Sequence, residues 1–105
     1  VLSCGYNGYG QLGRETGGDR DSSFQKIEKL SGIIRIECGY THSLCIDKSF
    51  YLFIFGGNEC GQLGFNDTEN RYSPIKRSSN IIDISSGGFH NFIKTSNNEI
   101  YAFGD

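Results

Sequence analysis

An all-β chain built from a duplicated unit is predicted by two internal echoes and by the spacing of the apolar residues. The heptapeptide N-G-Y-G-Q-L-G at 7–13 returns 51 residues later at 58–64 as N-E-C-G-Q-L-G. A second echo pairs 33–44 with 81–92 at an offset of 48. Self-similarity at a fixed period of roughly 50 residues is typical of repeat proteins. The fall from 51 to 48 predicts three extra residues in the first unit, in the loop after Gly13.

The apolar residues come in short runs without sustained helical spacing, and these runs predict strands. They are rich in Ile, Phe and Tyr, and turn signals separate them, so successive strands should pair antiparallel through short links. The runs are 24–27, 33–38, 43–47, 51–55, 73–76, 81–85, 91–95 and 99–103, and an opening strand passes through Cys4. Four short strands per unit are typical of a β-propeller blade. The prediction is a partial propeller of two four-stranded antiparallel blades plus one extra strand. It forms a single domain, 1–105, with repeat units at about 5–55 and 56–104.

Composition narrows the classes of function. Fifteen glycines against one proline indicate turns rather than a disordered linker. Ten basic and twelve acidic residues lie scattered along the sequence, so no surface that follows a phosphate backbone is expected, and nucleic acid is not an expected partner. No apolar run approaches the roughly 20 residues of a membrane helix, and no signal segment opens the chain. A membrane is therefore not an expected partner, although a segment of either kind could lie outside this sequence.

The four cysteines are predicted to be reduced structural thiols. No C-x-x-C pair is present, and Cys45 stands where the other unit has Ile93, which favours a small buried apolar role. A disulfide or a metal site is the less favoured alternative. Reduced thiols favour a cytoplasmic or nuclear location. No cofactor or metal is expected.

The repeated polar residues are predicted to build the scaffold rather than a ligand site. Gln11 and Gln62 recur at one place of the motif, and an amide can bridge backbone groups of a loop. The two histidines, His42 and His90, are likewise equivalent, and each is expected to bond the turn after the preceding glycine through both ring nitrogens. The structural motif positions are Gly10, Gln11, Leu12, Gly13, Gly39, His42, Gly56, Asn58, Gly61, Gln62, Leu63, Gly64, Gly87, His90 and Gly104.

Nothing in the sequence indicates a catalytic site. Ser43 follows His42, but Asn91 follows His90, so a Ser–His nucleophilic pair is not repeated. The G-Q-L-G motifs lack the lysine and hydroxyl residue of a phosphate-binding loop. The acidic residues show no paired spacing. The chain is therefore not expected to be an enzyme by itself.

The pattern I-x-C-G-x-x-H-S-L-x-I, followed by F-x-F-G-x-N-x-x-G-Q-L-G, resembles the repeat of the regulator of chromosome condensation family. The resemblance covers essentially the whole chain and implies a seven-bladed β-propeller. Phe55 and Phe103 replace the tryptophan that this family favours before the closing glycine. Lys26 stands where the second unit has Pro74. Phe50 occupies a turn where the family favours glycine or asparagine, as in Asn97-Asn98.

Two repeat units cannot close a ring, because such units are stable only when neighbours bury both of their faces. The chain is expected to be a piece of a larger propeller, a degenerate gene product, or a subunit that completes its ring by self-association. Remaining blades in the same polypeptide, or further copies, should cover the exposed blade faces. The apolar run 50–55 is the stretch that most needs such cover.

The leading functional hypothesis is a protein–protein interaction module, because variable loops on a rigid frame usually carry recognition. The loop 14–23 is the candidate partner-binding loop. The alternative is that it is only a solvent-exposed connection between strands. Its candidate residues are Arg14, Glu15, Asp19, Arg20 and Asp21. The family resemblance implies a second hypothesis, which is guanine-nucleotide exchange on a Ran-type small GTPase by a complete propeller. No residue here matches an exchange-specific motif.

Overall fold

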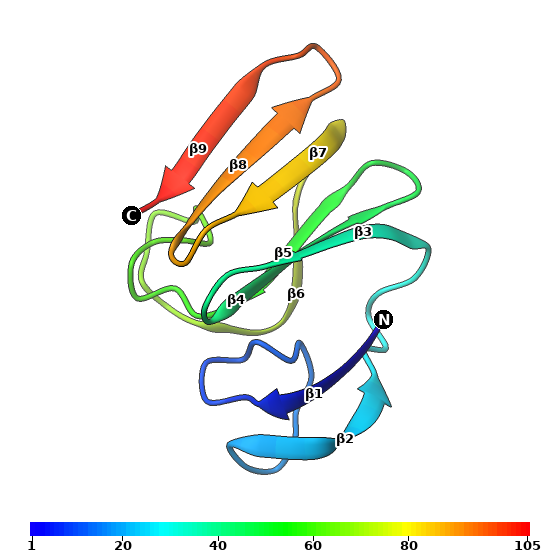
Figure 1. The fold of residues 1–105 in the computed structure, drawn as a ribbon, viewed down its shortest axis with the longest axis vertical. Helices are drawn as coiled ribbons and strands as arrows, with labels where there is room; N and C mark the ends of the chain where they lie inside the picture. The colour runs from blue at the N-terminus through cyan, green and yellow to red at the C-terminus, as the bar shows by residue number, and fades with distance from the viewer.

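The computed structural model describes residues 1–105 and contains nine strands in three antiparallel sheets (Figure 1). The strands are β1 (Leu2–Tyr6), β2 (Arg20–Lys26), β3 (Ile33–Cys38), β4 (His42–Asp47), β5 (Leu52–Gly56), β6 (Arg71–Ser78), β7 (Ile81–Ser86), β8 (His90–Thr95) and β9 (Ile100–Gly104). The predicted all-β class and the nine strands are confirmed. No helix of the structure is long and apolar enough to cross a membrane.

The strands are grouped differently from the prediction. They form a two-stranded sheet β1-β2, a four-stranded sheet β3-β4-β5-β6 and a three-stranded sheet β7-β8-β9. The expected two complete blades plus one strand are therefore corrected to one complete blade between two partial ones. The reason is that the strand after each G-Q-L-G loop returns to the strand before that loop, so β6 pairs with β5 and β2 with β1. The complete blade thus straddles the two sequence units.

Strand register shows which partial blade lacks which strands. Gly5 of β1 corresponds to Gly56 of β5, and each glycine pairs with the first part of the strand that follows its long loop. The sheet β1-β2 thus contains the third and fourth strands of a blade. The sheet β7-β8-β9 contains the first, second and third strands, because His90↔Gly104 repeats the pairing His42↔Gly56. Equivalent strands therefore run in the same direction in all three sheets, so that the long loops leave the sheets at the same end.

The register also corrects the position of the insertion. Fifteen residues separate Gly5 from its partner Asp21, and fourteen separate Gly56 from Arg71, so only one extra residue lies in the loop after Gly13. The other two lie in the link to the next blade, which has six residues after Lys26 and four after Lys76. This longer link supplies two buried anchors, Ile27 and Leu30.

The same register changes the residue equivalences in β2. Leu2 pairs with Lys26, and its counterpart Phe53 pairs with Lys76. Lys26 therefore corresponds to Lys76, and Phe24 takes the place of Pro74. The predicted equivalence of Lys26 and Pro74 is therefore wrong. It assumed that all three extra residues precede β2, whereas two of them follow it.

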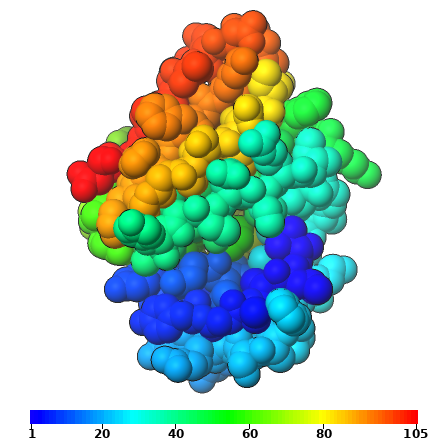
Figure 2. Space-filling view, in the orientation of Figure 1, coloured from blue at the N-terminus to red at the C-terminus, as the bar shows by residue number.

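The larger core fills the junction between the complete blade and the sheet β7-β8-β9. Its buried residues are Leu44, Ile46, Leu52, Ile54, Leu63, Ile81, Ile84 and Ile93. A smaller cluster, Ile27, Leu30, Cys45 and Phe55, lies on the other side of the complete blade. Figure 2 shows the resulting stack, with the N-terminal sheet on one side of the complete blade and the C-terminal sheet on the other.

The apolar run 50–55 is largely covered by these neighbours. Leu52 and Ile54 face the larger cluster, while Phe55 belongs to the smaller one and Phe53 packs against it. The ammonium group of Lys76 lies 4.0 Å from the ring centroid of Tyr51 and shields its face. Both faces of β5 are thus occupied, and only Phe50 stays exposed at the turn.

Candidate interaction surface

Each long loop is organised by an asparagine at its start. Asn7 accepts the backbone N–H of Leu12 at 3.0 Å, and its amide donates to the carbonyl of Arg14 at 3.0 Å. Asn58 repeats the first bond with Leu63 at 2.9 Å, and its amide donates to a carbonyl further along its loop, that of Asp67, at 3.1 Å. Both asparagines are buried, so these bonds satisfy polar groups that would otherwise be costly.

The glutamines bond within the same loops. The Oε1 atom of Gln11 accepts the N–H of Tyr9 at 2.9 Å, and that of Gln62 accepts the N–H of Cys60 at 2.9 Å. Two successive turns follow in each loop, from Gly10 N–H to Asn7 and from Gly13 N–H to Gly10, with the same pattern at Gly61 and Gly64. Leu12 and Leu63 point inward and are buried. The motif therefore makes two rigid, equivalent loops.

The last glycine of each motif lies against an aromatic ring. Gly13 has a φ of 69° and Gly64 a φ of 73°, which is the left-handed region that favours glycine. A Cβ at Gly13 would lie 2.8 Å from the ring of Phe55, and one at Gly64 would lie 2.9 Å from the ring of Phe103. The phenylalanines that replace the family's tryptophan are thus packed directly on the loop motif.

The sequence predicted that each histidine bonds the turn after the preceding glycine through both ring nitrogens, and this prediction is wrong. Instead, each imidazole occupies the space where Gly39 or Gly87 lacks a side chain. The Nε2 atom of His42 lies 2.8 Å from Oδ1 of Asn91, and its Nδ1 atom is buried without a partner. His90 is exposed.

Asn91 joins the two blades, a role that the sequence analysis missed. Its Oδ1 atom also accepts the hydroxyl of Ser86 at 2.9 Å, and its amide donates to the carbonyl of Gln62. Because that oxygen is an acceptor, Nε2 of His42 carries the proton. The equivalent residue Ser43 donates to the carbonyl of Gln11 at 3.1 Å. The sequence did contain a signal for this role, because a polar residue, Ser43 or Asn91, follows each histidine.

Burial lowers the pKa of His42 below its ordinary value, and the hydrogen bond to Asn91 opposes this shift. The neighbouring His90 lowers the pKa further, and Glu59 raises it. The ring is therefore neutral at neutral pH, in the tautomer that the junction requires.

The candidate partner-binding loop divides into inward and outward residues. Arg14 is turned inward, where it pairs with Asp21 at 2.9 Å and donates to the hydroxyl and carbonyl of Ser3. Hydrogen bonds from Ser23, together with Arg14, lower the pKa of Asp21 to about 2. Glu15, Asp19 and Arg20 are exposed. The ion pair of Arg14 with Asp21 stabilises the loop, and the three exposed side chains are available to a partner.

The second long loop uses a lock of the same type with the charges exchanged. Arg71, at the register position of Asp21, pairs with Asp67 at 2.8 Å. The hydrogen bond from Arg71 lowers the pKa of Asp67. The guanidinium also covers the ring of Phe65 at 4.7 Å.

Charges that are scattered in the sequence are segregated in space. The loop end comprises residues 7–21, 39–41, 57–71, 87–89 and 105, and carries seven carboxylates against three arginines. The opposite link end comprises residues 26–32, 47–51, 76–80 and 94–99, and carries six basic side chains against three carboxylates. This follows from the equal strand directions, which bring all long loops to one end.

An exposed tyrosine, packed on a partly buried phenylalanine, lies at the loop end of the filled junction. Tyr40 is 77% exposed, and its ring meets Phe89 edge to face with 5.3 Å between centroids. Its backbone N–H donates to the carbonyl of Gly88, and its ring covers that glycine. The turn between β7 and β8 of the next sheet therefore holds this side chain in place.

No group of three or more histidine, cysteine or acidic side chains is arranged to hold a metal ion. All four cysteines are free thiols. Burial, with a contribution from nearby Cys38, raises the pKa of Cys45 to about 12. That thiol is therefore protonated and serves as an apolar core residue.

Comparisons with known proteins agree with this geometry. The model of the regulator of chromosome condensation (RCC1) repeat matches residues 1–46 and 51–93. The chain is 36% identical to human "Probable E3 ubiquitin-protein ligase HERC4" over 99% of its own length, and 32% identical to human HERC3 over 98%. It spans only 10% of the length of each of these relatives.

Solved structures show the same fold. Human WBSCR16 superposes with a TM-score of 0.88 at 23% identity, covering all of this chain and 29% of that protein. Yeast RCC1 (Prp20), in its complex with Kap60, superposes with a TM-score of 0.84 at 19% identity, covering 98% of this chain and 27% of that protein. The three sheets are thus part of an RCC1-type propeller, and the chain belongs to the RCC1 repeat family.

Proposed function

We propose that the chain is a protein-recognition part of an RCC1-type propeller and that its loop end meets the partner. The observation that carries this proposal is the combination of Tyr40, exposed yet packed on the next blade, with the excess of carboxylates at the same end of the molecule. Rigid exposed tyrosines suit interface centres, because they bring a large contact area at a small cost in conformational entropy. The partner that fits is a protein segment with net positive charge.

The rest of the loop end supports this assignment. The two long loops are held by buried asparagines and by their Arg–Asp pairs, so little ordering is required on binding. Exposed acidic groups without an ion pair, Glu15, Asp19 and Glu59, lie on these loops. In a protein of the type of the similar E3 ligases, this surface would hold another protein while the chemistry occurs elsewhere.

The test compares variants at the two ends. Tyr40→Ala combined with Glu59→Lys changes the loop end, and Lys48→Glu is the matched charge reversal at the link end. Immobilised protein should retain a set of partners that the first variant loses and the second keeps. Binding should weaken between about 50 and about 300 mM salt, since charge attraction is screened. Equal retention by both variants would refute the assignment to the loop end.

Guanine-nucleotide exchange on a Ran-type GTPase is the alternative, and it is favoured by the likeness to yeast RCC1. An exchange factor binds the nucleotide-free GTPase more tightly than the loaded one, so it needs a complementary surface rather than a catalytic group. A complete propeller containing these blades should then accelerate the release of labelled GDP. If the rate of GDP release is unchanged while partners are still retained, the exchange function is refuted and the recognition role stands.

A further inference from the structure

Several aromatic rings of this molecule are covered by cations of the same chain. The guanidinium of Arg71 lies 4.7 Å from the ring centroid of Phe65, and the ammonium group of Lys76 lies 4.0 Å from that of Tyr51. A cation over the face of a ring is attracted by the electron density of the ring. An open ring face beside a free carboxylate is therefore suited to a cation from another molecule.

Arg71 shows the complete arrangement at the loop end. Its guanidinium covers the ring of Phe65 and also pairs with the carboxylate of Asp67 at 2.8 Å. A planar guanidinium suits this arrangement, because it can stack on a ring while its N–H groups bind a carboxylate. One arginine, one ring and one carboxylate thus form a unit in the second long loop.

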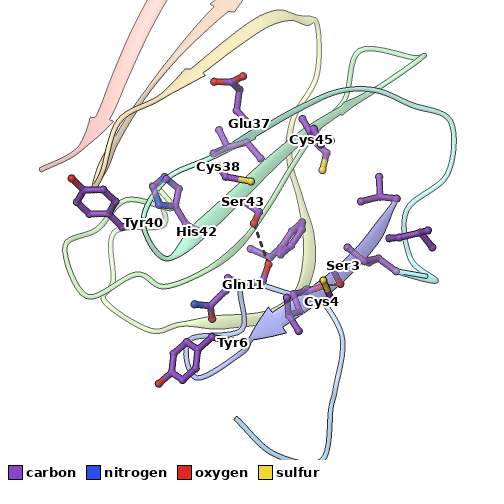
Figure 3. Close-up of a pocket in the computed structure, with 18 of the residues that line it drawn as sticks. Ser3, Cys4, Tyr6, Gln11, Glu37, Cys38, Tyr40, His42, Ser43 and Cys45 are labelled. Atoms are coloured by element: carbon purple, nitrogen blue, oxygen red, sulfur yellow. Dashed lines mark hydrogen bonds between the residues drawn. The ribbon is translucent and has the colours of Figure 1, made fainter. Parts of the chain in front are cut away.

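Tyr40 presents a ring at the same end of the molecule, and no cation of the chain covers it. One side of the ring lies on Gly88, where an added Cβ would be 2.7–3.1 Å from three ring atoms. The plane of Phe89 is inclined at 88° to that of Tyr40, so this contact is edge to face. Figure 3 shows the ring beyond His42, directed away from the strands. Because the side chain is 77% exposed, the side of the ring away from Gly88 is open.

Glu59 supplies a carboxylate beside this turn. The backbone N–H of Gly57 donates to the carbonyl of Thr41, the residue after Tyr40, at 2.8 Å. The Oε2 atom of Glu59 lies against the same glycine, 3.3 Å from the place that a Cβ would take. Glu59 is exposed and makes no ion pair within the chain. An open ring and a free carboxylate therefore lie at one turn.

We infer that Tyr40 and Glu59 together bind one arginine side chain of the partner, with the guanidinium stacked on the open face of the ring and paired with the carboxylate. This inference rests on the function proposed for the loop end, and it names the residue that the basic partner inserts. Lysine fits less well, because its ammonium group is a compact, strongly hydrated point charge without a planar face. The excess of carboxylates attracts the basic segment, and the site at Tyr40 selects the arginine.

The test titrates the full chain with two capped pentapeptides that have arginine or lysine between two glycines on each side. NMR spectra follow the backbone and ring signals of the protein. The arginine peptide should shift the signals of residues 39–41, 57–59 and 88–89. It should also bind at least about 3-fold more tightly than the lysine peptide, because only the guanidinium can stack and pair at once.

Variants separate the ring from the carboxylate. Tyr40→Phe should keep the binding of the arginine peptide, because the ring face remains, whereas Tyr40→Leu should abolish it. Glu59→Gln should weaken that binding by about 3-fold or more and remove the preference over lysine. Tyr101→Leu is the matched control, because it removes another exposed tyrosine ring and should change nothing.

Equal affinities for the two peptides would overturn the inference, and so would shifts that Tyr40→Leu leaves in place. Neither result would touch the recognition role, which fails only if the protein with Tyr40→Ala and Glu59→Lys retains every partner. Failure of the arginine site and failure of the recognition role are therefore distinguishable.

Discussion

The strands β4 and β8 occupy equivalent positions in two successive repeats, but their equivalent residues differ in burial. His42 is 1% exposed at the filled junction, whereas His90 is exposed on the open face of the C-terminal sheet. Leu44 is fully buried, and its equivalent Phe92 is 47% exposed. The difference teaches that a residue's role in this fold depends on the neighbouring blade and not on its own strand.

The largest expected effect separates these equivalent positions. Leu44→Ala should lower the free energy of unfolding by about 2–5 kcal/mol, because it opens a cavity in the larger core. Phe92→Ala should cost less than about 1 kcal/mol, because that ring is already half in water. Denaturant unfolding of both variants measures the contrast. Equal losses would mean that the open face is covered in solution.

Asn91→Ala should have the next largest effect, about 1–3 kcal/mol, because it removes the acceptor of His42 and the donor to the carbonyl of Gln62. Ser43→Ala, at the equivalent position, should cost less because it breaks one partly buried hydrogen bond. The same unfolding experiment decides between them. A larger loss for Ser43→Ala would contradict the assignment of Asn91 as the link between blades.

Acidification should weaken the filled junction. Burial holds the pKa of His42 below its ordinary value of 6.5, so the unfolded chain binds this proton more readily than the folded chain. Stability from this group is present above the unfolded pKa and falls as the pH drops below about 6.5. Melting curves between pH 8 and pH 5 measure this, and His42→Gln should reduce the dependence. A wild-type Tm that rises on acidification in this window would contradict it.

The smallest expected effect is a gain at the turn between β4 and β5. Phe50 has a φ of 66° and corresponds to Asn98, which has a φ of 64°. A left-handed conformation costs an ordinary side chain about 1 kcal/mol, and asparagine or glycine tolerates it better. Phe50→Asn should therefore raise the Tm by a few degrees, and Asn98→Phe should lower it. A loss of stability on Phe50→Asn would mean that the exposed ring makes a stabilising contact.

The loops were the most predictable part of the molecule. The asparagine and glutamine of each motif bond backbone groups two to nine residues away, so their hydrogen-bonding pattern is set by one heptapeptide and its neighbours. Strand existence was predictable for a similar reason, because alternating apolar residues between turn signals are local. The inward position of Arg14 was not predictable, because this loop residue bonds Ser3 on β1, eleven residues earlier in the sequence.

The sequence by itself determined that the chain is a repeat of short antiparallel strands with two equivalent loops. Only the tertiary structure decided that the strands fall into sheets of two, four and three, since the same antiparallel pattern allows either neighbour as the partner. It also decided which histidine is buried, because His42 finds its partner 49 residues away on the next blade. Local bonding is encoded in adjacent residues, whereas burial depends on which blade faces each side chain.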